Sequence, residues 1–346
     1  MTTQFIGTTF PSSSDWHADE KTLIGNIYNQ IESHFSTNSN LFINTTWFGP
    51  QFDNNEWVKY KNAVASSKFD NLFLLAAADP VFLNHAQIAD MQQETGAQLY
   101  CLGHFDSPYY FNFHSQVLPK YFVKYDQSEL LMRQPKYVFV NYNRKPRDHR
   151  SALVNLFLQQ KLDTRGVITL GQQHQVFGRK INIKKNLSLN ETPDTAVGNW
   201  GMSMEFGIPH DIHSLGNLEV WQNHFLTVVG ETEFFPWDNL FISEKTWKPI
   251  LGLRPFVING QTKVYNFLRN HGFRTFEHYF NGIKIENISE LEVHDSIVKV
   301  VEYFAAMNDA KLMSIYQDML PDLLHNQNRF WEFSAEQKNK INQLFV

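Results

Sequence analysis

The sequence predicts an α/β protein of two domains, and three observations predict it. Short apolar segments typical of buried strands alternate with segments whose apolar residues recur at helical spacing. This alternation occurs early in the chain and again from about residue 136 onward. The chain has 346 residues, 42% of them hydrophobic and 15% aromatic, which is enough for two cores of ordinary size.

The first set of elements predicts a Rossmann-like domain over residues 1–132. A helix is expected over 21–35, and its apolar residues share one face. Strands are expected at 41–48, 71–77 and 98–103, with helices at 56–66 and 84–96 between them. Strands that alternate with helices form parallel sheets covered on both faces. The segment 123–135 is interpreted as the connection to the second domain.

The second set predicts another Rossmann-like domain over residues 133–288. Strands are expected at 136–142, 225–231 and 254–260, with helices at 151–161 and 264–270 and a helix start at Glu244. The regular pattern fails over 171–217, which we interpret as a long insertion with room for short elements. Residues 289–346 read as helices, expected to pack back toward the first domain.

Composition narrows the class of protein. The net charge of −5 gives no general electrostatic reason to bind nucleic acid. A single cysteine, Cys101, excludes an intramolecular disulfide and multi-cysteine zinc sites, and we expect it to pack in a strand. Residues 1–10 lack a secretory signal, and no apolar run is long enough to span a membrane. We therefore expect a soluble cytoplasmic protein.

Charged residues come directly after the strands of the second set. Glu231 ends one strand, and Glu244 and Lys245 begin the following helix. In open α/β sheets, ligands bind beyond the carboxyl ends of the strands, where these residues are expected to lie. The alternatives are a solvent-facing carboxylate for Glu231 and a surface pair between Glu244 and Lys248 at helical spacing.

A basic cluster follows the strand at 136–142. Arg144, Lys145, Arg147 and Arg150 stand at the start of the next expected helix, where positive charge opposes the helix dipole. Either these side chains are solvated, or a bound anion compensates their positive charge. Arg150 is the preferred ligand for such an anion.

This order of residues resembles the donor-binding half of glycosyltransferase family 10, the fucosyltransferase-like enzymes. In that family a strand leads to a Ser-Asn turn and an arginine-bearing helix, and a later strand ends in Glu-Asn-Ser before Tyr-x-Thr-Glu-Lys. The likeness runs from Lys136 to Phe276. Asn141 or Asn143 matches the asparagine of the turn, and Arg150 matches the arginine of the helix. Glu231 matches the glutamate of Glu-Asn-Ser, and Glu244-Lys245 matches the final Glu-Lys pair. The segment from Leu162 to Gly166 resembles a short Asp-x-x-Gly segment of the family.

The sequence also departs from the family pattern. Glu231-Thr232-Glu233 replaces Glu-Asn-Ser, and Phe241 stands where the family usually has tyrosine. The spacing from Glu231 to Glu244 is longer by about three residues.

The resemblance implies the GT-B architecture, in which two Rossmann-like domains face a cleft, and an inverting transfer from a nucleotide-sugar. No Asp-x-Asp metal signature occurs, so the donor diphosphate is expected to be neutralised by Arg150 and Lys245 without a metal or further cofactor. Asn143, Arg144 and Arg147 are further donor-binding candidates. By resemblance, Glu244 accepts hydrogen bonds from the ribose hydroxyls, and Glu231 orients the sugar or Lys245.

The acceptor hydroxyl needs a general base from the first domain. Asp106 and Asp79 both follow expected strands, and Asp106 is preferred, although both precede turn residues and fit a turn role as well. His104 lies beside Asp106, and His17 and His114 stay open as bases. His210 and His213 are interpreted as loop residues, Trp247 as core, and Lys248 and Arg254 as solvated.

The acceptor itself stays open. A glycan or a small molecule is the first expectation, and hydroxymethylated bases in DNA are the second, because a basic stretch runs from Arg179 to Lys185. The competing hypothesis is a non-catalytic protein that binds a nucleotide-sugar.

Overall fold

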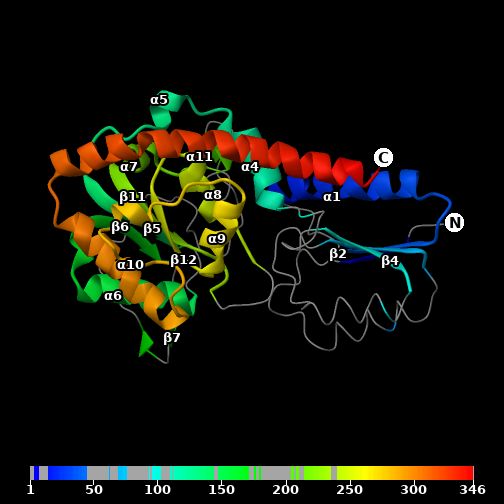
Figure 1. Cartoon of the computed structure of the whole chain (residues 1–346), viewed down its shortest axis with the longest axis horizontal. Helices are drawn as coiled ribbons and strands as arrows, with labels where there is room; N and C mark the ends of the chain where they lie inside the picture. The colour runs from blue at the N-terminus through cyan, green and yellow to red at the C-terminus, as the bar shows by residue number, and fades with distance from the viewer. Residues whose placement is uncertain are drawn as a thin grey trace. The chain divides into compact units, whose positions relative to one another are not determined.

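The computed structural model describes residues 4–7, 15–44, 62, 69–75, 93, 96–102, 110, 112–143, 147–170, 175–176, 179–180, 204–205, 208–209, 214–234 and 240–345. The chain forms two compact units. The first comprises Met1–Val117, Trp237–Phe241 and Phe333–Val346, and the second Leu118–Pro236 and Ile242–Glu332. Each contains a four-stranded parallel sheet (Figure 1), so the predicted α/β class with parallel sheets is confirmed.

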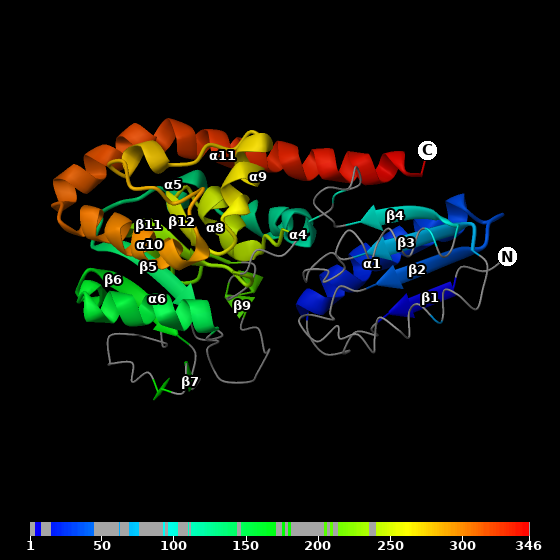
Figure 2. The ribbon, with the colours of Figure 1, turned by 60° about the horizontal axis from the view of Figure 1, so that its bottom comes forward.

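The sheet of the first unit has the order β1-β2-β3-β4, and Figure 2 shows its strands side by side. The strands are β1 (Gln4–Gly7), β2 (Asn40–Asn44), β3 (Asn71–Leu75) and β4 (Gln98–Leu102), and α1 (Asp15–His34) connects the first two. The last three strands and α1 were predicted. The four residues of β1 are too few to form a recognisable pattern. The helices expected at 56–66 and 84–96 lie outside the described residues.

Burial explains these elements. Ile24, Ile27 and Ile31 of α1 are buried at helical spacing, and every residue of β3 is buried. Cys101 lies in β4 as expected, and burial raises the pKa of its thiol to about 12. Two short helices follow along the chain, α4 (Phe113–Phe122) and α5 (Gln127–Leu130).

The sheet of the second unit has the order β12-β11-β5-β6. Its strands are β5 (Tyr137–Asn143), β6 (Gly166–Leu170), β11 (His224–Gly230) and β12 (Phe256–Asn259). The helices of this part of the chain are α6 (Asp148–Gln159), η2 (Leu162–Thr164), α7 (Leu218–Gln222), α8 (Glu244–Leu251), α9 (Lys263–Asn270), η5 (Glu277–Tyr279), α10 (Glu290–Ala305) and α11 (Asp309–Gln343).

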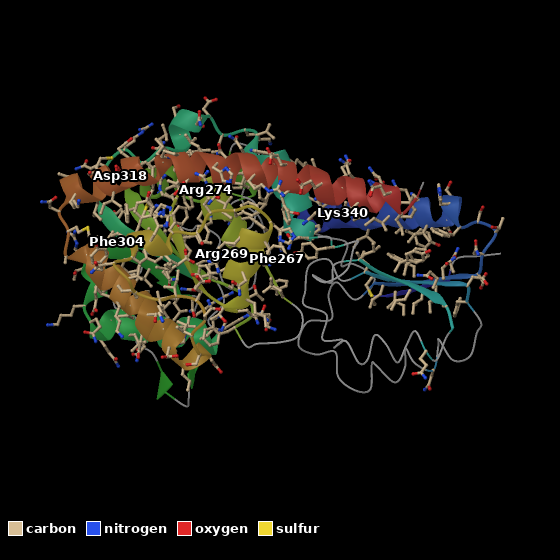
Figure 3. The ribbon with its side chains drawn as sticks, in the orientation of Figure 1. Phe267, Arg269, Arg274, Phe304, Asp318 and Lys340 are labelled. Carbon is tan, nitrogen blue, oxygen red and sulfur yellow. The ribbon has the colours of Figure 1, made fainter. Side chains whose placement is uncertain are left out.

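The core of this unit lies between its sheet and its helices. All seven residues of β11 are buried, as expected for a parallel strand covered on both faces. Phe304 of α10, labelled in Figure 3, packs against Phe225 of β11, with ring centroids 4.8 Å apart. Trp247 of α8 is fully buried against Phe273 and Phe330, which confirms its prediction as a core residue.

Strand β6 was not predicted, because its start was interpreted as the end of the Asp-x-x-Gly segment. That segment forms η2 and runs directly into β6, which pairs with β5. A Cβ atom on Gly166 would lie 2.3 Å from the Phe139 ring. Glycine is therefore required here by the close approach of a neighbouring strand.

The long insertion does contain short elements. β7 (Gln175–Val176) pairs antiparallel with β8 (Arg179–Lys180), and β9 (Met204–Glu205) pairs antiparallel with β10 (Ile208–Pro209). The other basic residues of the stretch, Lys184 and Lys185, lie outside the described residues.

The prediction that Arg254 is solvated was wrong, because its side chain is fully buried. Its guanidinium donates hydrogen bonds to the carbonyls of Leu130, Trp221 and Leu253, each at or just past the end of a helix, and to the hydroxyl of Tyr316. Helix ends carry unpaired carbonyls and partial negative charge. One cation thus stabilises the ends of α5, α7 and α8, a role that local sequence does not reveal.

Candidate functional site

The strand order of the second unit contains a reversal. After β5 the chain adds β6 on one side, and then returns to add β11 and β12 on the other side. The two directions diverge between β5 and β11, which pair directly. Such a topological switch point leaves a crevice beyond the carboxyl ends of the strands, where α/β proteins bind ligands. The described strands of the first unit follow chain order without a reversal.

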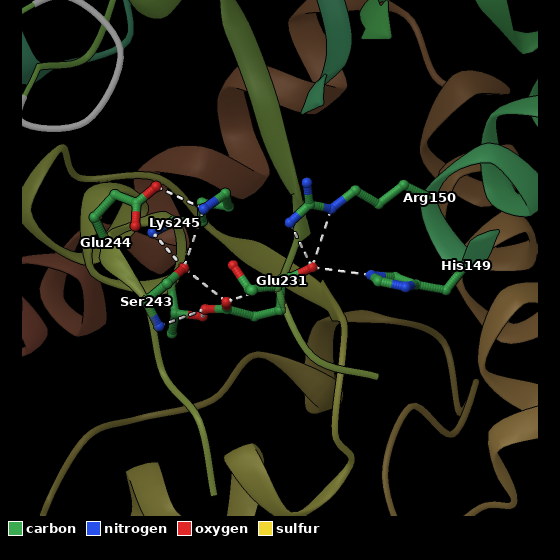
Figure 4. A network of polar contacts seen from close by, with 8 residues as sticks. His149, Arg150, Glu231, Ser243, Glu244 and Lys245 are labelled. Atoms are coloured by element: carbon green, nitrogen blue, oxygen red, sulfur yellow. Dashed lines mark hydrogen bonds and ion pairs between the residues drawn. The ribbon is translucent and has the colours of Figure 1, made fainter. Parts of the chain in front are cut away.

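Glu231 occupies this position, directly after β11, and its side chain is fully buried. Its carboxylate accepts four hydrogen bonds, from the backbone N–H groups of Thr232 and Ser243 and the hydroxyls of Ser243 and Thr246, at 2.6 to 3.0 Å (Figure 4). These donors fill the acceptor sites of a carboxylate. The solvent-facing alternative for Glu231 was therefore wrong, and its side chain anchors the first turn of α8.

The backbone carbonyl of Glu231 anchors a second helix. Its oxygen accepts hydrogen bonds from Arg150 Nε at 3.0 Å, Arg150 Nη2 at 2.7 Å and His149 Nε2 at 2.9 Å. Figure 4 shows both side chains extending from α6 to this one oxygen. One residue thus holds the first turns of α6 and α8 together at the switch point.

This arrangement brings the two predicted phosphate ligands close to each other. Arg150 is buried, and about a quarter of the Lys245 side chain is exposed. The pKa of Lys245 is lowered, mainly because burial removes water from the ammonium and also because Arg150 repels it, while Glu244 acts in the opposite direction. Both cations stand at helix starts, which favour an anion, and in the free protein the carboxylates of Glu244 and Glu231 balance their charge.

Glu244 is the first residue of α8, as predicted, and its side chain is 9% exposed. Its Oε1 accepts a hydrogen bond from Lys245 Nζ at 2.6 Å, and the same ammonium lies 3.4 Å from Ser243 Oγ. Ser243 caps the helix by accepting a hydrogen bond from the N–H of Lys245. Glu244 therefore forms an ion pair with its immediate neighbour.

Arg147 forms a second ion pair at the same edge of the sheet. Its Nη1 lies 3.1 Å from Glu233 Oε1, and about a third of the Arg147 side chain is exposed. The two carboxylates of Glu231-Thr232-Glu233 thus have separate partners, one in the first turn of α8 and the other just before α6.

Asn143 ends β5 beside this network and is fully buried. Its Nδ2 donates to Asn141 Oδ1 at 2.6 Å, and Asn141 Nδ2 donates to the carbonyl of Val228. Asn143 Oδ1 is buried, has no hydrogen-bond partner within the described part of the chain, and lies against Gly230, where a Cβ atom would approach it to 2.3 Å. Both matched asparagines therefore join β5 to β11, and Gly230 allows their close approach.

A stack of three rings lies next to the network. The rings of His149 and Phe234 are 5.1 Å apart and nearly parallel, and Phe234 stacks in the same way on His294 of α10. The side chain of Asn259 contacts the residues at both ends of the stack: its Nδ2 donates to the carbonyl of His149, and its Oδ1 lies 3.1 Å from His294 Nε2. Burial is the main cause that lowers the pKa of both histidines, that of His149 to about 3. Both rings are therefore neutral at neutral pH.

The general-base candidates fall largely outside the described part of the chain. The structure does not describe Asp79, Asp106 and His104. The donor candidate Arg144 and the loop histidines His210 and His213 also lie outside the described residues. His17 lies in α1, and His114 is buried in α4.

Sequence reasoning did not single out Ser243, Thr246, His149, Phe234 or His294. Ser243 had one usable signal, because serine just before a helix start is a common cap. The ring stack joins residues far apart in sequence, so no local pattern indicates it.

Fold and site together define an α/β protein with parallel sheets and a cluster of charged side chains of both signs at a topological switch point. No family model matches this chain, and no curated protein and no solved structure matches it significantly. Among the described residues, no group of three or more His, Cys, Asp or Glu side chains is placed to hold a metal ion. No helix in that same part of the chain is long and apolar enough to cross a membrane.

Proposed function

We propose that this protein is a glycosyltransferase of GT-B architecture that moves a sugar from a nucleotide-sugar donor to an acceptor hydroxyl, with inversion and without a metal. The observation that carries the proposal is the proximity of Arg150 and Lys245 at the β5–β11 switch point: Arg150 bonds to the carbonyl of Glu231, and Lys245 follows Ser243, which bonds to the Glu231 carboxylate. The resemblance to glycosyltransferase family 10 assigns the same residues to donor binding.

The chemistry of the transfer fits these cations. The acceptor oxygen attacks the anomeric carbon, the bond from that carbon to the diphosphate breaks, and the proton passes to a general base, proposed to be Asp106 or Asp79. Negative charge grows on the departing nucleoside diphosphate, and preorganised cations stabilise it best when they are fixed before the reaction. The contacts through Glu231 supply such fixing.

Glu244 and Lys245 take complementary parts of the donor in this proposal. In the free protein the carboxylate and the ammonium neutralise each other at 2.6 Å. A nucleotide offers a phosphate to the ammonium and a ribose diol to the carboxylate, so Lys245 exchanges one anionic partner for another and Glu244 accepts hydrogen bonds from the two hydroxyls. The acceptor is a glycan or a small molecule.

The first test is release of nucleoside diphosphate from a panel of nucleotide-sugars, with and without EDTA. Turnover is expected to persist in EDTA, and loss of activity that manganese restores would refute the metal-free mechanism. Nucleotide binding without turnover for any acceptor would favour the non-catalytic hypothesis.

The second test compares Lys245→Met with Lys248→Met, a matched change one turn further along α8. Loss of a charge-assisted bond worth about 1.5–3 kcal/mol should weaken donor binding roughly 10- to 150-fold in Lys245→Met. The value of kcat should fall as well, because charge grows in the transition state. Equal kinetics for the two variants would place the diphosphate elsewhere.

A further inference from the structure

We propose that the ring of His149 is a stacking platform for the nucleobase of the bound nucleotide; this inference rests on the proposed function. His149 forms one end of the ring stack with Phe234 and His294. Phe234 is buried with a ring on each face, whereas His149 is only partly buried. In the described part of the chain, no second ring contacts His149.

The position of His149 relative to the cations specifies the ligand. His149 Nε2 and two nitrogens of Arg150 all lie within 3.0 Å of the carbonyl oxygen of Glu231. A ring face and a guanidinium anchored on one atom suit a ligand that carries an aromatic ring and a phosphate on one short frame. A nucleotide carries both an aromatic ring and a phosphate, whereas a sugar phosphate has no aromatic ring.

The chemistry of the ring supports stacking on a base of any type. A carbonyl oxygen only accepts hydrogen bonds, so His149 Nε2 carries the proton and the ring is held by its edge. Its orientation is fixed further by the nearly parallel packing on Phe234, at an interplanar angle of 14°. An immobilised, neutral ring loses little entropy when a base stacks on it, and stacking tolerates every nucleobase.

Two substitutions at His149 separate stacking from a purely positioning role. His149→Phe keeps an aromatic ring but loses the N–H that reaches Glu231, whereas His149→Gln keeps N–H donors but loses the ring. We expect His149→Phe to bind GDP and UDP as the wild type does. His149→Gln should bind both roughly tenfold more weakly while keeping wild-type affinity for inorganic pyrophosphate, as measured by calorimetry.

His294→Gln is the matched control, because it removes the ring at the far end of the stack, which is not bonded to Glu231. Its affinity for GDP should be unchanged. Loss of pyrophosphate and nucleotide binding in parallel in His149→Gln, or an equal loss in His149→Phe, would overturn the platform and leave a positioning role.

If the variants do not fold, an NMR measurement on the wild type tests the same inference. The ring protons of His149 should shift in the proton NMR spectrum when GDP binds, and stay in place when pyrophosphate binds. No such shift at saturating GDP would overturn the inference. A wild type that binds neither nucleotide nor pyrophosphate would instead refute the proposed function itself.

Discussion

Glu231→Gln is the substitution that tests most directly how the site is held together. The amide keeps the shape of the side chain and removes its charge. Each carboxylate oxygen of Glu231 faces one backbone N–H and one hydroxyl: Oε1 faces Ser243 N and Thr246 Oγ1, and Oε2 faces Thr232 N and Ser243 Oγ. Either orientation of the glutamine amide therefore points its NH₂ group at one backbone N–H.

The magnitude follows from these contacts. A hydroxyl can rotate and accept from the amide, but a backbone N–H cannot, so one buried donor loses its partner at a cost of about 1–3 kcal/mol. The bonds that remain weaken from charge-assisted to neutral, by about 1 kcal/mol each. Relief from burying a charge offsets part of the loss. We expect the free energy of unfolding to fall by about 2–4 kcal/mol.

Urea unfolding monitored by circular dichroism measures this change. The matched control is Glu233→Gln, because Glu233 pairs with Arg147, whose side chain is about a third exposed and therefore partly screened. A loss below about 1 kcal/mol in Glu231→Gln, or an equal loss in both variants, would refute the anchoring role. Affinity for pyrophosphate should also fall in Glu231→Gln, because the start of α8 is no longer fixed.

Three further predictions concern other parts of the second unit. Arg254→Met should destabilise the fold by about 2–4 kcal/mol in thermal unfolding, because the carbonyls of Leu130 and Trp221 lose their guanidinium donor, whereas that of Leu253 keeps the hydroxyl of Tyr316. Arg254→Lys should cost less, and equal stability of Arg254→Met and wild type would contradict this. Gly230→Ala should lower the unfolding midpoint, because its Cβ would meet Asn143 Oδ1 at 2.3 Å, and adding Asn143→Ala should recover part of the loss; independent, additive effects would exclude the clash. Folding lowers the pKa of His149 from its ordinary value of 6.5 to about 3. Between these two pH values the imidazole binds a proton in the unfolded chain but not in the folded one. The free energy of unfolding should therefore fall as the pH drops through that window. His149→Phe should flatten this dependence, and an unchanged slope would mean that His149 is protonated in the folded state.

Local sequence was sufficient for the elements with strong patterns. The apolar runs of β5 and β11 and the spacing of buried residues in α1 depend only on which residues are neighbours in the chain. The same holds for Glu244 and Lys245 at the start of α8. The positions of Glu231 and Asn143 at strand ends also followed from sequence, because a strand end is a local property.

The contacts that these residues make could not be predicted from local sequence, because they form only in the folded chain. Glu231 was as compatible with a solvent-facing carboxylate as with the anchor that it forms, because Ser243 and Thr246 reach it only once α8 packs beside β11. Arg254 looked like an ordinary surface arginine, since helix ends from three separate parts of the chain make its pocket.

The sequence by itself therefore determined the α/β class, most of the parallel strands and the charged residues that follow them, because these depend on short-range periodicity and composition. Only the tertiary structure decided that β11 lies beside β5, that the strand order reverses there, and that Glu231 joins α6 to α8. The physical reason is that strand pairing and buried hydrogen bonds join residues distant in sequence. Their partners are selected by the packing of the whole unit rather than by neighbouring residues.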